Sequence, residues 1–256
     1  MNFNYLFDAK TTSSVIASSY HTLMSKIELK SLIQSLIQNP LPSNLGKQEL
    51  HKIIDDLILL NHTGEIKYKY LLAKMFVEED SICAFEVKTP TNRIDFVRVN
   101  GISNSYEIKS GLDNLLKLEK QSNNYNKFFE KNYIVIDEKH LEKAINIVPG
   151  NYGIIINEKN KLVEKRKAIY SNCLNPVNQL SIFSKKELAF YFKELDITKI
   201  INTQGESLVN KVFKEMIKKR YSTRWKFLLS RHKEIYSIDY QFFFQKNIQP
   251  CIIYSA

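Results

Sequence analysis

Three short segments with a period of two lie close together in this sequence, at residues 84–88, 93–99 and 105–110, and they restrict the chain to folds that contain a β-sheet. Alternating side chains point to opposite faces of a strand, so each segment predicts a strand with two different faces. Asn100 and Gly101 separate the second segment from the third, and this pair is typical of a tight turn. We therefore expect the second and third strands to be antiparallel neighbours.

After the third strand the pattern alternates between helix and strand. The spacing of leucine and aromatic residues predicts a helix over 112–130, and the apolar run Tyr-Ile-Val-Ile predicts a buried strand at 133–136. A helix from His140 to the residue before Pro149 is expected next, followed by two strands at 152–157 and 161–168. This order predicts an α/β fold in which helices flank one mixed sheet.

Helices are also expected on both sides of this core. Apolar residues at helical spacing predict them over 27–37, 50–60 and 64–79. Beyond Pro176, Ser184 is a suitable N-cap for a helix over 185–195, and a long basic helix begins at Glu206. The sequence thus predicts a helical N-terminal extension at 1–62, a core at 63–170 and a basic helical region at 171–256.

The residues that suggest chemistry are Asp95, in Arg-Ile-Asp-Phe, and Glu107 with Lys109, in Tyr-Glu-Ile-Lys-Ser. On one strand Glu107 and Lys109 point to the same face. Two carboxylates brought together from neighbouring strands repel each other unless a cation lies between them, and Mg²⁺ prefers such hard oxygen ligands. Lys109 would then orient the attacking water or stabilise charge on phosphorus.

At these residues the sequence resembles the PD-(D/E)XK nuclease superfamily, in which an acid on one strand is followed by Glu-x-Lys on the next. The stretch 86–153 is more closely similar to an uncharacterised bacterial family of small PD-(D/E)XK-like proteins that carries an "sce" locus label. Besides the two strand motifs, the shared residues are Asp113, Leu115, Leu118, Gln121, Tyr125, the Tyr-Ile-Val-Ile strand and His140. Ile94, where the superfamily often has proline, departs from the pattern.

This resemblance implies a restriction-endonuclease-like core and a divalent ion, Mg²⁺ or Mn²⁺, held by Asp95 and Glu107. The helix before the first strand often lends a further acid in such folds, which Glu65 matches, while Glu86 competes for that role from its own strand. Gln121 and Tyr125 are similar to the Gln-x-x-x-Tyr of the RecB-like branch. The resemblance implies that Gln121 contacts metal-bound water or the nucleic-acid backbone and that Tyr125 supports it.

The formal net charge of +10 favours polyanionic partners, because cations placed against phosphates release condensed counterions. Lysine-rich composition can also reflect an AT-rich genome. The predicted phosphate contacts lie in the basic helix, at Lys218, Lys219, Arg220 and Arg224. The alternative for these cations is an ordinary solvated helix face, and the expected place of Trp225 is the core.

Three scattered cysteines and the lack of a signal peptide or a long apolar run indicate a cytoplasmic protein without membrane insertion. We expect a Mg²⁺-dependent phosphodiesterase that acts on DNA as an endonuclease or nickase, with anti-phage defence as a role suggested by analogy. A non-catalytic nucleic-acid-binding or partner-binding module on the same fold and an RNA-cleaving effector are the alternatives. A protein partner or a homo-oligomer is compatible with either.

Overall fold

The computed structural model describes residues 4–255, which form two compact units. The first, here called the helical unit, combines residues 1–70 with 226–256, and the second, here called the sheet unit, runs from Leu71 to Trp225. The structure therefore divides the chain at other points than the boundaries expected after residues 62 and 170, because the end of the chain groups with its beginning. Two helices, α4 (Glu65–Phe76) and α10 (Glu206–Arg231), continue across the division.

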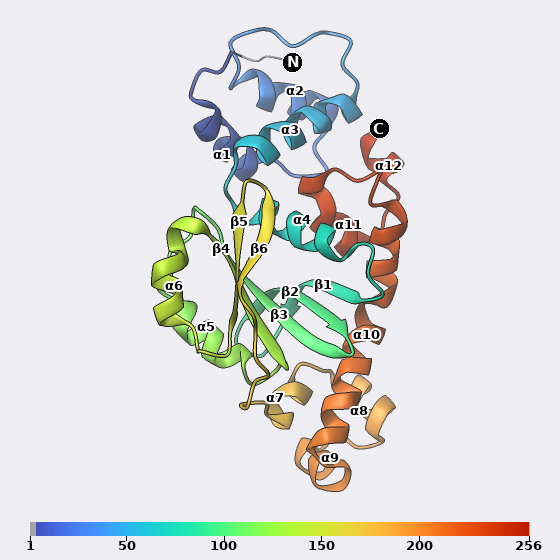
Figure 1. Cartoon of the computed structure of the whole chain (residues 1–256). Coiled ribbons are helices and arrows are strands. Elements are labelled where there is room, and N and C mark those ends of the chain that lie inside the picture. Colours follow the sequence, from blue (N-terminus) through green and yellow to red (C-terminus); the bar gives the residue numbers. More distant parts are fainter. Residues whose placement is uncertain (1–3, 256) are drawn as a thin grey trace. The chain divides into compact units, whose positions relative to one another are not determined.

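The sheet unit contains one six-stranded mixed sheet with strands in chain order (Figure 1). β3 pairs in parallel with β4 and β4 with β5, and the other neighbours are antiparallel. The predicted α/β fold with one mixed sheet is confirmed. The strands are β1 (Ile82–Lys88), β2 (Arg93–Asn100), β3 (Ile102–Lys109), β4 (Lys131–Asp137), β5 (Gly153–Glu158) and β6 (Lys161–Arg166).

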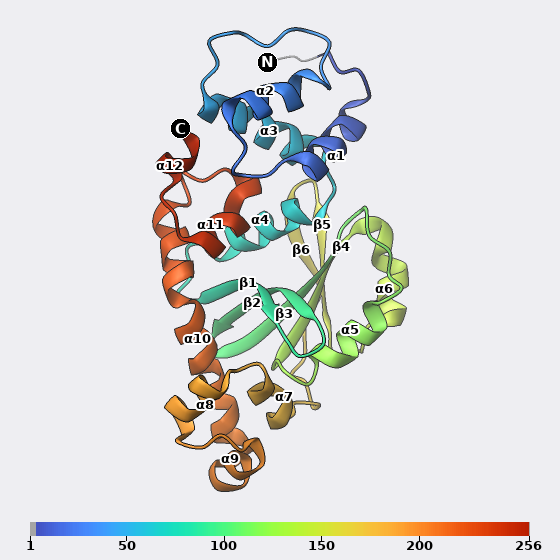
Figure 2. The ribbon, with the colours of Figure 1, turned by 180° about the vertical axis from the view of Figure 1, so that it is seen from behind.

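Helices from two parts of the chain cover the two faces of this sheet (Figures 1 and 2). On one face lie α5 (Leu118–Tyr125), the short η1 (Glu138–His140) and α6 (Leu141–Ile147), with Leu118 and Ala144 in a buried cluster against β4 and β5. On the opposite face α10 places the ring of Trp225 6.3 Å from that of Phe96 on β2. Trp225 is fully buried, as expected.

Three shorter helices precede α10 in the sheet unit: α7 (Pro176–Ser181), α8 (Lys185–Phe192) and α9 (Ile197–Gln204). The expected cap at Ser184 is confirmed, because its hydroxyl accepts a hydrogen bond from the Glu187 amide in a capping box. The predicted long helix from Glu206 is α10. Among the described residues, none of the helices has both the length and the apolar character that a membrane span requires.

The helix expected over 112–130 is much shorter in the structure, because α5 begins only at Leu118. Asp113 accepts hydrogen bonds from the amide and hydroxyl of Ser110, and Asn114 accepts one from the Leu116 amide. Such side chains satisfy backbone groups in a turn and so compete with helix formation. Leucine periodicity alone gave the wrong start, and Leu116 is 88% exposed.

The helical unit joins the two ends of the chain around an apolar core in which α3 contributes the most residues. Part of this core is Ile238, in the short η2, which packs with Leu29, Ile33 and Ile54. Besides the first part of α4 and the last part of α10, the unit contains α1 (Ala9–Ser19), α2 (Lys26–Gln34), α3 (Lys47–Asn61), η2 (Ser237–Asp239), α11 (Tyr240–Lys246) and α12 (Pro250–Tyr254).

A buried polar network around Asp239 also connects these ends. The Asp239 carboxylate accepts hydrogen bonds from Tyr20 at 2.9 Å, Thr22 at 2.6 Å and Tyr254 at 2.8 Å, and His51 Nδ1 lies 2.8 Å from the Tyr20 hydroxyl. Burial raises the pKa of Asp239 to about 6 despite these hydrogen bonds. Burial, with a smaller contribution from Lys47, lowers the pKa of His51 to about 4.

These two shifts have opposite effects on stability. The ordinary pKa of aspartate is 3.8, so the raised folded-state value makes the Asp239 contribution fall as the pH rises from 4 to 6. The ordinary pKa of histidine is 6.5, so the lowered value makes the His51 contribution grow as the pH rises over the same window.

We predict that Asp239→Asn makes the free energy of unfolding rise between pH 4 and pH 6.5 by about 3 kcal/mol more than in the wild type. His51→Asn, which keeps a donor near the Nδ1 position, should make it rise by about 3 kcal/mol less. Urea unfolding at a series of pH values measures both. Changes of the same sign in the two variants would contradict the assignment.

Candidate functional site

Asp95 lies where β2 and β3 stop pairing. The ladder between these antiparallel strands runs from Asn100 opposite Ile102 to Phe96 opposite Tyr106, and the same register puts Asp95 opposite Glu107. Beyond the last pair, the Ile108 amide donates a hydrogen bond of 2.7 Å to the Asp95 carboxylate. A side-chain oxygen therefore takes the place of a ladder carbonyl, which fixes the orientation of the acid beside Glu107.

Glu107 and Lys109 point to one face of β3, as the alternation predicted. Their side chains form an ion pair of 2.6 Å, and they are only 2% and 12% exposed, respectively. Burial by itself lowers the pKa of Lys109, but the negative charges of Glu107, Asp95 and Asp113 outweigh this effect, so the pKa is raised. Lys109 is therefore a cation at neutral pH, within the electrostatic influence of three carboxylates.

Tyr125 faces these groups from α5, and Gln121 lies one turn before it. Burial raises the pKa of Tyr125, and the charges of Glu107 and Asp95 raise it further, so the phenol lies near both acids. Its hydroxyl donates a hydrogen bond of 2.8 Å to the backbone carbonyl of Arg93. Gln121 is close enough to affect the pKa of Tyr125, and no described donor reaches its buried Oε1. The structure thus brings Tyr125 to the acids and Gln121 to Tyr125.

Glu86 is placed beside Asp95 by an unusual backbone. The β1–β2 register pairs Phe85 with Phe96 and Val87 with Ile94, so Glu86 lies opposite Asp95. Its φ of 55° is in the left-handed region, which is costly for a residue with a Cβ. The Glu86 carboxylate also lies 3.7 Å from the Arg93 guanidinium. Such strain is typical of functional sites.

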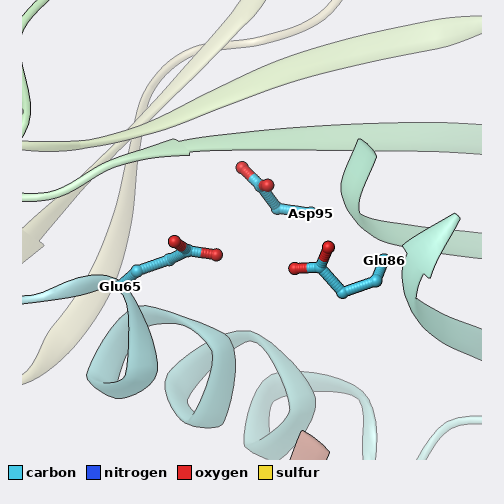
Figure 3. Close-up of side chains that lie close together, drawn as sticks. All are labelled: Glu65, Glu86 and Asp95. Carbon is cyan, nitrogen blue, oxygen red and sulfur yellow. The ribbon is translucent and has the colours of Figure 1, made fainter. Parts of the chain in front are cut away.

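Glu65 is in the first turn of α4, where its carboxylate forms a 2.5 Å ion pair with Lys69. Within the sheet unit, a carboxylate oxygen of Glu86 lies within 4.8 Å of one of Asp95, and Figure 3 shows these two side chains pointing toward one another. Of the two acids that the sequence offered as alternatives, Glu86 lies beside Asp95 in the sheet unit, and Glu65, in the helical unit, stays a predicted ligand. These hard oxygen donors fit Mg²⁺ or Mn²⁺.

The four cations predicted on the basic helix have different surroundings. Arg220 makes two hydrogen bonds to Glu187, at 2.7 and 2.6 Å, and its guanidinium lies 4.5 Å from the centre of the Phe183 ring. Lys219 and Arg224 are exposed, and Lys218 is half-buried. The Arg220 side chain stabilises the packing of α8 on α10, which leaves Lys218, Lys219 and Arg224 as the predicted phosphate contacts on this helix.

Sequence reasoning missed several contacts that surround the site. Arg93 pairs with Glu86, and Asp113 raises the pKa of Lys109. The turn between β1 and β2 also lies against α5, through a hydrogen bond of 2.9 Å from Asn124 to Thr91. A periodicity argument cannot find this last contact, because its partners are 33 residues apart. His140 contacts the Ser110 carbonyl at 3.1 Å.

Comparison with known proteins adds a family. Residues 64–243, more than half of the chain, match the family described as Bacteriophage P4 protein cII. The chain belongs to this family. The match includes every acid of the site, together with Lys109, Gln121 and Tyr125.

A comparison with curated proteins gives no match. Among solved structures, a protein of unknown function from Silicibacter pomeroyi is similar with a TM-score of 0.34 and 16% sequence identity, over 43% of this chain and 73% of that chain.

We predict that the free energy of unfolding is about 0.5–1 kcal/mol higher for Glu86→Gly than for Glu86→Ala. Glycine adopts the left-handed backbone without a Cβ penalty. Both variants lack the carboxylate, so their difference isolates the backbone conformation. Urea unfolding of the two proteins gives this difference. Greater stability of the alanine variant would contradict the strained geometry at Glu86.

Proposed function

We propose that this protein is a metal-dependent nuclease that hydrolyses phosphodiester bonds of DNA. The observation that carries the proposal is the arrangement at the end of the β2–β3 ladder, where Asp95 lies opposite Glu107 and Lys109 pairs with Glu107. An acidic group for a divalent cation, beside a buried lysine, is the combination that phosphodiester hydrolysis requires.

Asp95 and Glu86 would hold the ion, with Glu107 and Glu65 as the further predicted ligands. When bound, Mg²⁺ or Mn²⁺ supplies Lewis-acid stabilisation of a phosphate oxygen and lowers the pKa of a water. The residues of the chain have separate tasks. Lys109 stabilises negative charge that develops on the phosphate, and its pairing with Glu107 holds it in place before substrate arrives.

Gln121 and Tyr125, which both belong to α5, support the acids and Lys109. The Tyr125 hydroxyl is fixed by the Arg93 carbonyl, so the phenol remains against the acids without titrating at neutral pH. Gln121 has a buried amide oxygen available to accept a hydrogen bond from a water or to orient one. The contact of Lys218, Lys219 and Arg224 with phosphate remains a prediction, as does a role in anti-phage defence.

The proposal is tested by incubating the protein with supercoiled plasmid, linear duplex, single-stranded DNA and RNA, each with Mg²⁺, Mn²⁺ or EDTA. Glu107→Gln, which keeps the side-chain shape, is the matched control. We expect cutting of DNA with either metal and none in EDTA or in the control. Binding of DNA without cutting under any metal would favour the non-catalytic module, and cutting of RNA alone would favour the RNA-cleaving effector.

Lys109→Gln separates transition-state stabilisation from metal binding. We expect kcat to fall by about 10²–10³-fold, the usual effect of removing one such charge-stabilising group. Titration calorimetry should give Mg²⁺ binding that is unchanged or tighter, because a positive charge beside the carboxylates has been removed. Asp95→Asn should instead weaken metal binding. Wild-type cleavage by Lys109→Gln would exclude the assigned role of the lysine.

A further inference from the structure

A polar hollow lies beside the candidate site, on the outer side of α5. It has a volume of about 450 Å³, and no acid is among its lining residues. One wall is the turn between β1 and β2, and the other is α5 with Lys127, two residues beyond its end. The lining residues are Thr91, Asn92, Lys120, Asn123, Asn124 and Lys127.

Two hydrogen bonds connect the two walls of the hollow, and the second of them comes from Tyr125, which lies near the acids. Asn124 donates to Thr91 at 2.9 Å, and the next residue, Tyr125, donates to the Arg93 carbonyl at 2.8 Å. Along α5, residues that line the hollow are followed by residues on the side of the site. Lys120 and Asn124 line the hollow, while Tyr125 lies near Glu107 and Asp95 and Gln121 lies beside Tyr125.

Two lysines and several amides form a surface that suits phosphate. Lys120 and Lys127 are exposed, and the side chains between them donate hydrogen bonds without carrying negative charge. Glu119, which is exposed on the same helix, does not line the hollow. A phosphate held here would therefore gain Coulomb attraction without opposition from a lining carboxylate.

The sheet separates this surface from the basic helix. Asp95 and Phe96 are adjacent on β2, so their side chains point to opposite faces. Phe96 packs against Trp225 of α10, whereas Tyr125 of α5 lies on the face of Asp95. The exposed cations of α10 therefore belong to a helix on the far face of the sheet, and those of α5 to a helix on the same face as the acids.

We propose that the surface formed by Thr91, Asn92, Lys120, Asn123, Asn124 and Lys127 binds the phosphodiester backbone of the DNA strand that the acidic site cuts. This inference rests on the proposed function for its choice of DNA. Lys120 and Lys127 neutralise two phosphates beside the one that is cleaved, and the amides hold the strand in register.

The test is DNA binding without cleavage, by fluorescence anisotropy of a labelled duplex in EDTA over a range of salt concentrations. Lys120→Ala/Lys127→Ala is compared with Lys218→Ala/Lys219→Ala, which removes the same charge from α10. We expect the α5 variant to bind about tenfold more weakly at low salt and to reduce the slope of log K against log salt by about 1.8, at 0.9 per phosphate. Because Lys218 and Lys219 are themselves predicted phosphate contacts, the α10 variant measures their contribution separately. The control is Lys185→Ala/Lys186→Ala, an exposed pair on α8, which should remain within about a factor of two of the wild type.

Wild-type affinity of the α5 variant, or a loss confined to the α10 variant, would overturn the inference, as would tighter binding of an RNA of the same sequence. Thermal melting of both variants establishes that they are folded. Cleavage assays keep the two proposals apart. If wild-type protein cuts DNA and the α5 variant binds and cuts equally well, only the inference fails. If nothing is cut but the α5 variant loses binding, the surface stands and the nuclease proposal fails.

Discussion

The hydrogen bond from the Ile108 amide to the Asp95 carboxylate is the interaction on which the candidate site depends. It ends the β2–β3 ladder without leaving a buried amide unsatisfied, which would cost about 1–3 kcal/mol. It also orients the carboxylate, because one oxygen is taken by the backbone. The acid thus has a structural task and a chemical one, and the strands separate at the point where the acids gather.

The same region contains a second local exception to regular sheet geometry. Glu86 has a left-handed backbone within β1, opposite Asp95, while the register on both sides of it is maintained. A regular strand backbone at Glu86 would be less strained, but it would orient the carboxylate differently. Strain that persists between well-paired neighbours is held by the surrounding sheet, as in other functional sites.

The basic residues differ in whether they are available to bind a polyanion and in which face of the sheet they lie on. Part of the basic character of the sequence is consumed inside the protein, since Lys214 pairs with Glu130 at 2.9 Å and Arg220 with Glu187 at 2.6 Å. Such pairs leave the net charge of +10 unchanged, but the number of basic residues overstates how many are available to a polyanion. The lysines beside α5 are few, but they lie on the same face as the acids, and position is more informative than number for phosphate contacts.

Much of the sheet unit could be predicted from the sequence, because period-two alternation, the Asn100–Gly101 turn and the cap at Ser184 act over a few residues. The same alternation predicted that Glu107 and Lys109 point to one face of their strand. Tertiary structure alone decided the rest. The start of α5 depends on the Ser110–Asp113 turn, Glu86 depends on strain within a paired strand, and the Asp239 network joins residues more than two hundred positions apart. Sequence periodicity reports which face of its own element a side chain occupies, whereas these features depend on which elements meet.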